Sequence, residues 1–213
     1  MNRTLEDLKD EYDKLQNIYG DSSLNSIYFG GCETNPDICL VFMNPTARNI
    51  TADKNWKGLR APWIGTKNVW HLFYKMGIID EEMYLRINTK KGKEWTPDFA
   101  IEVYEAVKNN GFYITNLAKC TQADARELPN EVYMQYLDLF MEEMKIVSPK
   151  KIILFGNQVS SIVLGEKISV SQVRKKRFLK DTLEFYSLYY PVGNGRFNID
   201  KAIEDFWYIK KGE

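Results

Sequence analysis

Two asparagines stand at the ends of hydrophobic segments that have the length and composition of buried strands. Asn44 follows residues 38–43, and Asn116 follows residues 112–115. Short unbroken hydrophobic runs of this kind are typical of strands inside a parallel sheet. The carboxyl ends of parallel strands lie at one edge of the sheet, where such folds bind their ligands. We therefore expect the two side-chain carboxamides to converge on one pocket.

A carboxamide presents a hydrogen-bond donor beside an acceptor. This pattern suits the edge of uracil, where a carbonyl oxygen lies next to an N–H. Asparagine is also a common turn residue, because it tolerates turn geometry and bonds its own backbone. One asparagine alone favours the turn interpretation, whereas two at equivalent strand ends favour a shared binding site.

The third candidate group is aromatic. The segment Ala61-Pro62-Trp63-Ile64-Gly65 places an indole in a loop, within a polar stretch from residue 47 to residue 67. Long irregular segments in compact domains are usually functional, and an indole stacks well on a flat ring. A loop anchored by a buried tryptophan is an equally compatible interpretation.

The segments that would position these residues alternate between predicted strands and predicted helices. The strands are predicted at residues 38–43, 112–117, 151–155 and 182–190. The helices are predicted at residues 5–19 (capped by Thr4), 68–76, 96–109 (capped by Thr96, with Pro97 in the first turn), 130–147, 159–164 and 199–209. Alternation of this kind implies a parallel sheet covered on both faces. We expect an α/β fold, a three-layer sandwich with a central, mostly parallel four-stranded sheet.

The chain length of 213 residues suits one domain with a sizeable core. We expect a single domain over residues 1–213, with residues 1–35 as an N-terminal helical extension. Basic and acidic residues number 29 each, so any contact with nucleic acid must come from a local patch. The dense basic run Arg174-Lys175-Lys176-Arg177 is either such a contact or a solvated loop.

The cysteines are Cys32, Cys39 and Cys120, and no two form a C-x-x-C pair. This odd number indicates free thiols in a reducing cytoplasm. The single histidine, His71, cannot build a histidine metal site alone. No hydrophobic run approaches the length of a membrane span, and residues 1–19 are too charged for a signal peptide. We expect a cytoplasmic monomer without metal, cofactor or membrane partner.

Five segments, taken together, resemble the motifs of uracil-DNA glycosylases. Residues 42–45, Phe-Met-Asn-Pro, resemble the first motif of the single-strand-selective and mismatch-specific branches. Residues 62–65, Pro-Trp-Ile-Gly, are similar to Pro-Phe-Val-Gly of the iron–sulfur branch. Residues 113–120, Tyr-Ile-Thr-Asn-Leu-Ala-Lys-Cys, are similar to that branch's Tyr-Ile-Thr-Asn-Val-Val-Lys-Cys. Residues 152–156 look like its hydrophobic strand, and residues 190–191, Tyr-Pro, stand where the family has His-Pro-Ser.

The resemblance has two departures. The iron–sulfur branch needs one cysteine more than this chain has, and only Cys120 falls on a family position, so the resemblance implies no cluster. Tyr190 replaces the histidine that, in the family, stabilises charge on the departing base. A tyrosine hydroxyl also donates a hydrogen bond, at a different reach, and a donor aimed at developing charge is worth ~3 kcal/mol.

The resemblance implies hydrolysis of the N-glycosidic bond of uracil, or of a related deaminated base, in DNA after the base has left the stack. Trp63 would stack on this base and Asn116 would bond its polar edge. Met43 and Pro45 are assigned with them to substrate binding. Asn44 would hold the attacking water.

The last motif supplies the remaining roles that the resemblance implies. Tyr190 would donate a hydrogen bond to the leaving base. The loop that follows would contact the DNA where the base left, with a phosphate contact from its arginine. The residues assigned to this contact are Pro191, Val192, Gly193, Asn194 and Arg196.

Three alternative functions remain. The first is a non-catalytic member of the same fold that binds a base or DNA, which Tyr190 favours. The second is a small-molecule hydrolase or nucleotide-binding domain, but neither the glycines at 30–31 nor those at 193–195 fit a phosphate loop, and no serine sits in a nucleophile elbow. The third, a purely structural interaction protein, would leave Asn44, Asn116 and Trp63 unexplained.

Overall fold

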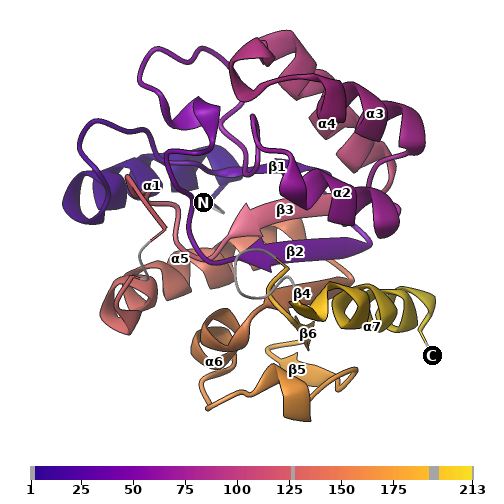
Figure 1. Ribbon diagram of the computed structural model, residues 1–213. Coiled ribbons are helices and arrows are strands. Elements are labelled where there is room, and N and C mark those ends of the chain that lie inside the picture. The colour runs from indigo at the N-terminus through magenta and orange to yellow at the C-terminus, as the bar shows by residue number, and fades with distance from the viewer. Residues whose placement is uncertain (1–2, 126–127, 192–196, 213) are drawn as a thin grey trace.

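The computed structural model describes residues 3–125, 128–191 and 197–212. Its centre is a six-stranded sheet in the order β1-β3-β2-β4-β6-β5, with helices on both faces (Figure 1). The four inner strands are the predicted ones, β2 (Ile38–Phe42), β3 (Phe112–Asn116), β4 (Lys151–Phe155) and β6 (Leu183–Leu188). All their mutual pairings are parallel. The α/β sandwich with a mostly parallel central sheet is therefore confirmed.

Two short strands enlarge the sheet beyond the four strands that the sequence predicts. At one edge β1 (Phe29–Gly31) pairs antiparallel with β3, and at the other β5 (Phe178–Lys180) pairs antiparallel with β6. Three residues are too few to show a periodic pattern, so neither strand is visible in the sequence alone. The predicted number of strands is wrong for this reason.

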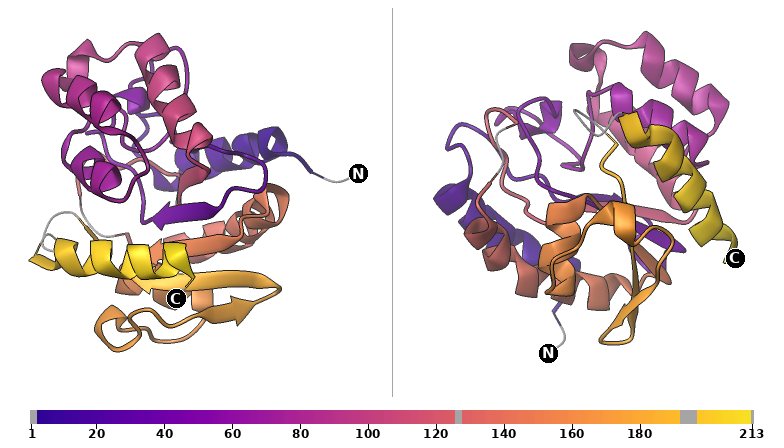
Figure 2. Two further views of the ribbon diagram at one scale, coloured as in Figure 1. Left: turned by 90° about the vertical axis from the view of Figure 1, so that its right-hand side faces the viewer. Right: turned by 60° about the horizontal axis from the view of Figure 1, so that its bottom comes forward.

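Helices cover each face of the sheet, as the right-hand view of Figure 2 shows. One face carries α1 (Leu5–Tyr19), α5 (Asn130–Val147) and α6 (Asn157–Leu164). The other carries α2 (Asn68–Lys75), α3 (Glu81–Thr89), α4 (Pro97–Asn109) and α7 (Ile199–Lys211). No helix among the described residues has the length and hydrophobicity needed to cross a membrane.

The predicted helix starts are confirmed by their capping contacts. The Thr4 side chain accepts a hydrogen bond from the backbone N–H of Asp7, and Thr96 does the same for Phe99. These bonds satisfy backbone donors that the first helical turn leaves unpaired. The sequence analysis missed α3, because this helix buries only Met83 and Ile87 and so shows little periodicity.

Strand register decides which side chains share a face. Phe42 of β2 lies opposite Asn116 of β3, and Val41 lies opposite Thr115. Because side chains alternate between the two faces of a strand, Asn116 points to the same side as Phe42, toward α2, α4 and α7. Thr115 points to the opposite side, toward α1 and α5. The division of the chain into one domain with an extension at residues 1–35 stays a prediction.

Gly31 generates a test of this architecture. Its φ is +104°, and an added Cβ would lie 2.3 Å from the carbonyl oxygen of Phe112. That oxygen already accepts a hydrogen bond from the backbone of Cys32. We expect Gly31→Ala to lower the free energy of unfolding by about 2–5 kcal/mol, measured by denaturant titration.

The matched control is Gly165→Ala, where φ is +76° but no atom lies within 4 Å of the added Cβ. Backbone strain alone should cost this variant about 1–2 kcal/mol. Equal losses in the two variants would show that the close approach of β1 to β3 is not the cause.

Candidate active site

The segments that follow β2 and β3 run side by side beyond the strands themselves. Asn116 is the last residue of β3, and Asn44 lies two residues beyond β2. The backbone N–H of Ala118 donates to the carbonyl oxygen of Met43 at 3.0 Å. The ladder therefore continues past the strand ends and holds both asparagines at one edge of the sheet, while the convergence of their side chains on one pocket stays a prediction.

Asn116 has the clearest sign of a binding function. Its side chain is 2% exposed, and its Nδ2 atom is buried without a hydrogen-bond partner among the described residues. Leaving a buried donor unpaired costs ~1–3 kcal/mol, and most such donors in native proteins are satisfied. A ligand that presents an acceptor oxygen at this place would remove the cost.

Trp63 is held in a backbone conformation that residues other than glycine rarely adopt. Its φ is +70°, which costs of order 1–3 kcal/mol and is found preferentially at functional sites. Three hydrogen bonds support it, because the Trp63 carbonyl oxygen accepts from Trp70 Nε1 at 3.1 Å, from Thr66 Oγ1 at 2.7 Å and from the Thr66 backbone N–H at 3.1 Å. The indole Nε1 of Trp63 itself is buried, and no group in the described part of the chain accepts a hydrogen bond from it.

Phe42 joins three of the predicted site residues into one cluster. Its ring meets the Trp63 ring edge to face, with centroids 5.0 Å apart, and lies 6.4 Å from the Tyr190 ring. The Phe155 ring stacks on the Phe42 ring, with centroids 4.5 Å apart and an interplanar angle of 6°. Since Asn116 is the register partner of Phe42, the structure brings Trp63, Asn116 and Tyr190 together on one face of the sheet.

Tyr190 is a neutral donor in this cluster. Its side chain is half-buried, and its hydroxyl forms no hydrogen bond with the part of the chain that the structure describes. Burial raises the pKa of Tyr190 to about 12, since a phenolate would lose its hydration. The hydroxyl therefore keeps its proton at neutral pH and remains able to donate to a ligand oxygen.

The Asn44 side chain is oriented by a residue that the sequence analysis missed. The hydroxyl of Tyr133, on α5, donates to Asn44 Oδ1 at 2.7 Å, and Asn44 Nδ2 donates to the Pro45 carbonyl oxygen at 3.1 Å. These bonds fix the amide with its oxygen toward α5, and a carbonyl oxygen can still accept a second bond. Asn44 and Asn116 share the edge but do not bond each other.

Met43 and Pro45 flank this asparagine. Met43 is half-buried and packs against the hydrophobic cluster on the α1 and α5 side. Pro45 is buried, and its carbonyl oxygen also accepts a bond from the backbone of Gln122 at 3.1 Å. Both residues shape the loop that carries Asn44, and their assignment to substrate binding stays a prediction.

Behind the site, on the opposite face of the sheet, lies a buried ion pair. Lys119 Nζ is 2.8 Å from Glu143 Oε2, and both side chains are 0% exposed. Lys119 also donates to Thr115 Oγ1 at 2.7 Å and to the carbonyl oxygen of Asn116. Burial lowers the pKa of Lys119, and the charge of Glu143 opposes this shift. The ammonium thus holds the backbone of the residue that would read the ligand.

Glu143 collects further hydroxyl donors around the same pair. Its Oε1 accepts from Thr115 at 2.7 Å and from Tyr113 at 3.1 Å, and its Oε2 accepts from Tyr12 of α1 at 2.6 Å. Sequence analysis could not find this network, because lysine and glutamate are usually exposed. The one signal in the sequence was the position of Lys119 in the segment 112–120, all of which the structure buries.

The remaining predicted contacts have different outcomes. Pro191 is buried, whereas Val192, Gly193, Asn194 and Arg196 lie outside the described residues.

The basic run at residues 174–177 is largely neutralised by acids. Its ion pairs join Arg174 to Glu204 and Asp205, Lys175 to Glu204, and Arg177 to Glu184.

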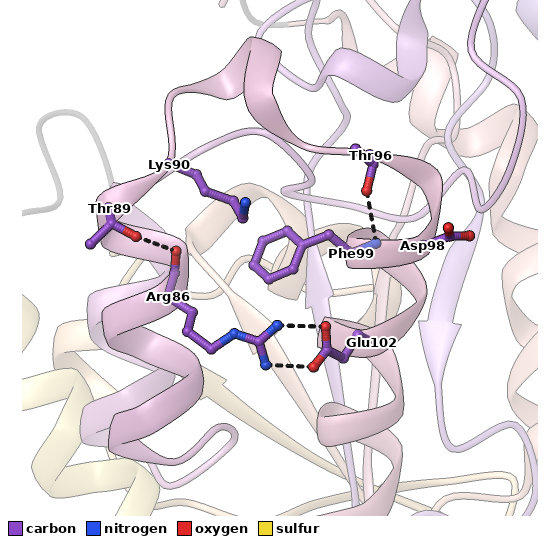
Figure 3. Close-up of a pocket in the computed structure, with 7 residues that line it drawn as sticks. All are labelled: Arg86, Thr89, Lys90, Thr96, Asp98, Phe99 and Glu102. Atoms are coloured by element: carbon purple, nitrogen blue, oxygen red, sulfur yellow. Dashed lines mark hydrogen bonds and ion pairs between the residues drawn. The ribbon is translucent and has the colours of Figure 1, made fainter.

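The residues that line two open hollows of the described surface do not belong to this cluster. One of about 410 Å³ is formed by α3 and the start of α4, where Arg86 makes a bidentate ion pair with Glu102 (Figure 3). Another, of about 350 Å³, lies between α1 and the segment around Arg60. Among the described residues, no group of three His, Cys, Asp or Glu side chains could hold a metal ion.

An α/β sandwich whose polar site lies beyond the carboxyl ends of its parallel strands defines a general class of ligand-binding enzyme folds. A family model described as the uracil DNA glycosylase superfamily matches residues 29–208. This chain belongs to the uracil DNA glycosylase superfamily. Helix α1 precedes the matched region, although its Tyr12 contributes to the network behind the site.

The buried ion pair generates a stability test. Glu143→Gln removes the negative charge and leaves the Lys119 ammonium buried without an ionic partner. We expect the free energy of unfolding to fall by about 3–5 kcal/mol. The control is Glu142→Gln, the adjacent residue, which pairs with Arg3 near the surface and should change stability by no more than about 0.5 kcal/mol. Similar losses in both variants would contradict the importance of the buried pair.

Proposed function

We propose that this protein is a DNA repair glycosylase that hydrolyses the N-glycosidic bond of uracil, or of a related deaminated base, in DNA. The observation that carries the proposal is the unpaired, buried Nδ2 donor of Asn116, set beside Trp63 and Tyr190 at the carboxyl edge of the sheet. The superfamily membership supports a glycosylase-type hydrolase. The proposal also includes DNA as the partner and a cytoplasmic, monomeric protein.

Recognition follows from the chemistry of these groups. The base leaves the stack at a cost of a few kcal/mol and stacks on Trp63. The Nδ2 of Asn116 donates to a uracil carbonyl oxygen, while its Oδ1 accepts the adjacent ring N–H. Cytosine presents an amino group in place of that oxygen, so two donors would face each other. A site built for a hydrogen bond rejects strongly a ligand that cannot form it.

Bond cleavage uses the other two residues. Asn44, oriented by Tyr133, holds a water molecule that attacks the sugar carbon, and positioning is its main contribution. The bond between that carbon and the base nitrogen breaks, and the base departs with the electron pair. Tyr190 donates a hydrogen bond to the oxygen on which this charge develops. The proton of the attacking water passes to solvent.

The carboxamide that would read the base is closed to solvent in this conformation. Asn116 Nδ2 is buried, so a base reaches it only after neighbouring side chains have moved. Binding that assembles the site in this way favours the correct base, because only that base repays the rearrangement. The segment from Pro191 to Phe197, whose Phe197 side chain is 79% exposed, would contact the DNA that the base has left.

The direct test is cleavage of oligonucleotides that contain one uracil, single-stranded and duplex, followed by alkali to break the abasic site. We expect cleavage by the parent protein. Asn116→Ala should lower its rate by at least about a hundredfold, because it removes the donor and acceptor together.

The control for this test is Asn110→Ala, at the opposite end of β3, where the carboxamide bonds the Ile78 carbonyl oxygen. It should keep the parent rate. A folded parent protein that cleaves neither substrate, nor oligonucleotides with other deaminated bases, would refute the proposal.

Tyr190 generates a pH test. Because its pKa is raised to about 12, the neutral donor persists between about pH 7 and about pH 10, and its ionisation should cause no loss of kcat in this range. Tyr190→Phe should lower kcat by about a hundredfold at every pH, since it removes a donor worth ~3 kcal/mol. A Tyr190→Phe variant as fast as the parent would remove Tyr190 from the mechanism.

A second candidate function is binding of a base or DNA without cleavage. Tyr190 in the position of the family's histidine favours it, as does the closed state of Asn116. Under this alternative the parent binds uracil-containing DNA without cutting it. A gain of cleavage in Tyr190→His would then show that the tyrosine is what prevents the reaction.

A further inference from the structure

Positive charge is concentrated on two segments next to the candidate site. Residues 47–67 and 88–93 contain eight lysines and arginines against one acid, Asp53, an excess of seven charges in a chain whose net charge is zero. The second segment, Asn88-Thr89-Lys90-Lys91-Gly92-Lys93, is a basic run that the sequence analysis passed over. A neutral chain with this asymmetry can still present a strongly basic surface.

The two segments are adjacent in space. Lys67 Nζ donates to the carbonyl oxygen of Asn88 at 2.6 Å. A Cβ added to Gly92 would lie 2.9 Å from the carbonyl oxygen of Gly65, which shows how closely the backbones approach. Gly65 lies two residues beyond Trp63, so the basic run lies against the loop that carries the proposed stacking residue.

We call five of these cations, four of them exposed and one half-buried, the lysine patch. It consists of Arg48, Lys67, Lys90, Lys91 and Lys93. All but Lys90 are exposed, and Lys90 is half-buried over the ring of Phe99, 4.8 Å from its centroid (Figure 3). Arg48 extends the patch to the other motif, because it lies four residues beyond Asn44.

The lysine patch differs from the basic run at residues 174–177 in its counter-charges. Within the described ranges, none of its members makes an ion pair, whereas Arg174, Lys175 and Arg177 are all paired with acids. Cations that already have acidic partners gain little from a phosphate. Unpaired ones displace condensed counterions from DNA and gain affinity by releasing them.

We infer that the lysine patch binds the sugar–phosphate backbone of the DNA strand beside the extruded base. The inference rests on the proposed function and adds to it the surface that binds the DNA strand. Such contacts fix the position of the protein but carry no sequence information. They therefore raise affinity for DNA with and without a damaged base.

The test uses a fluorescent oligonucleotide without uracil, single-stranded and duplex, titrated by anisotropy over a range of salt concentrations. The variant is Lys90→Gln/Lys91→Gln/Lys93→Gln. We expect the slope of log affinity against log salt to become shallower by about 2–3, and affinity at about 0.1 M salt to fall at least about tenfold. On uracil-containing substrate, KM should rise while kcat stays unchanged.

The control is Lys14→Gln/Lys108→Gln/Lys145→Gln, which makes the same charge change on α1, α4 and α5 and should keep the parent slope. Equal behaviour of the two triple variants would overturn this inference and leave the glycosylase proposal intact. A parent protein with no salt-dependent DNA binding and no cleavage would overturn both. A loss confined to Lys176→Gln/Arg177→Gln would place the DNA contact at the other basic run and overturn this assignment.

Discussion

The buried ion pair between Lys119 and Glu143 is the interaction on which the edge of the sheet depends. It joins the backbone of Asn116, two hydroxyls of β3 and the hydroxyl of Tyr12 into one network without solvent contact. Removing two charges from water is costly, and only complete hydrogen bonding offsets the cost. Because α1 supplies one of these bonds, a helix outside the family match belongs to the framework that holds the site.

The two faces of β3 are therefore opposite in character. On the side of Glu143 the polar groups are bonded to one another, which fixes the strand. On the side of Phe42, Asn116 and Trp63 each keep a buried donor without a partner, and Trp63 retains an unfavourable φ. These donors have already lost their water, so a matching base would not need to dehydrate them. A rigid strand with unmet donors on one face is well prepared to discriminate between ligands.

Much of the fold follows from local signals in the sequence. Hydrophobic runs locate the inner strands, and the Thr4 and Thr96 caps locate two helix starts. The strand ends place Asn116 and Tyr190 at one edge of the sheet, and the Trp63 loop packs there against Phe42. Contacts between distant segments leave no such signal. Tyr133 lies 89 positions from Asn44 in the sequence, and Arg174 lies 31 positions from Asp205. The orientation of Asn44 and the pairing of the basic run are therefore visible only in the folded chain.

The uneven distribution of charge also affects how the protein behaves without DNA. With seven excess positive charges on two segments and none overall, the remainder of the molecule is correspondingly acidic. Near the pI of about 6.6, copies do not repel one another, and the basic surface of one attracts the acidic surface of the next. Such attraction weakens as the Debye length shortens with salt. The protein should be least soluble in dilute buffer, and salt should dissolve the aggregates that form there.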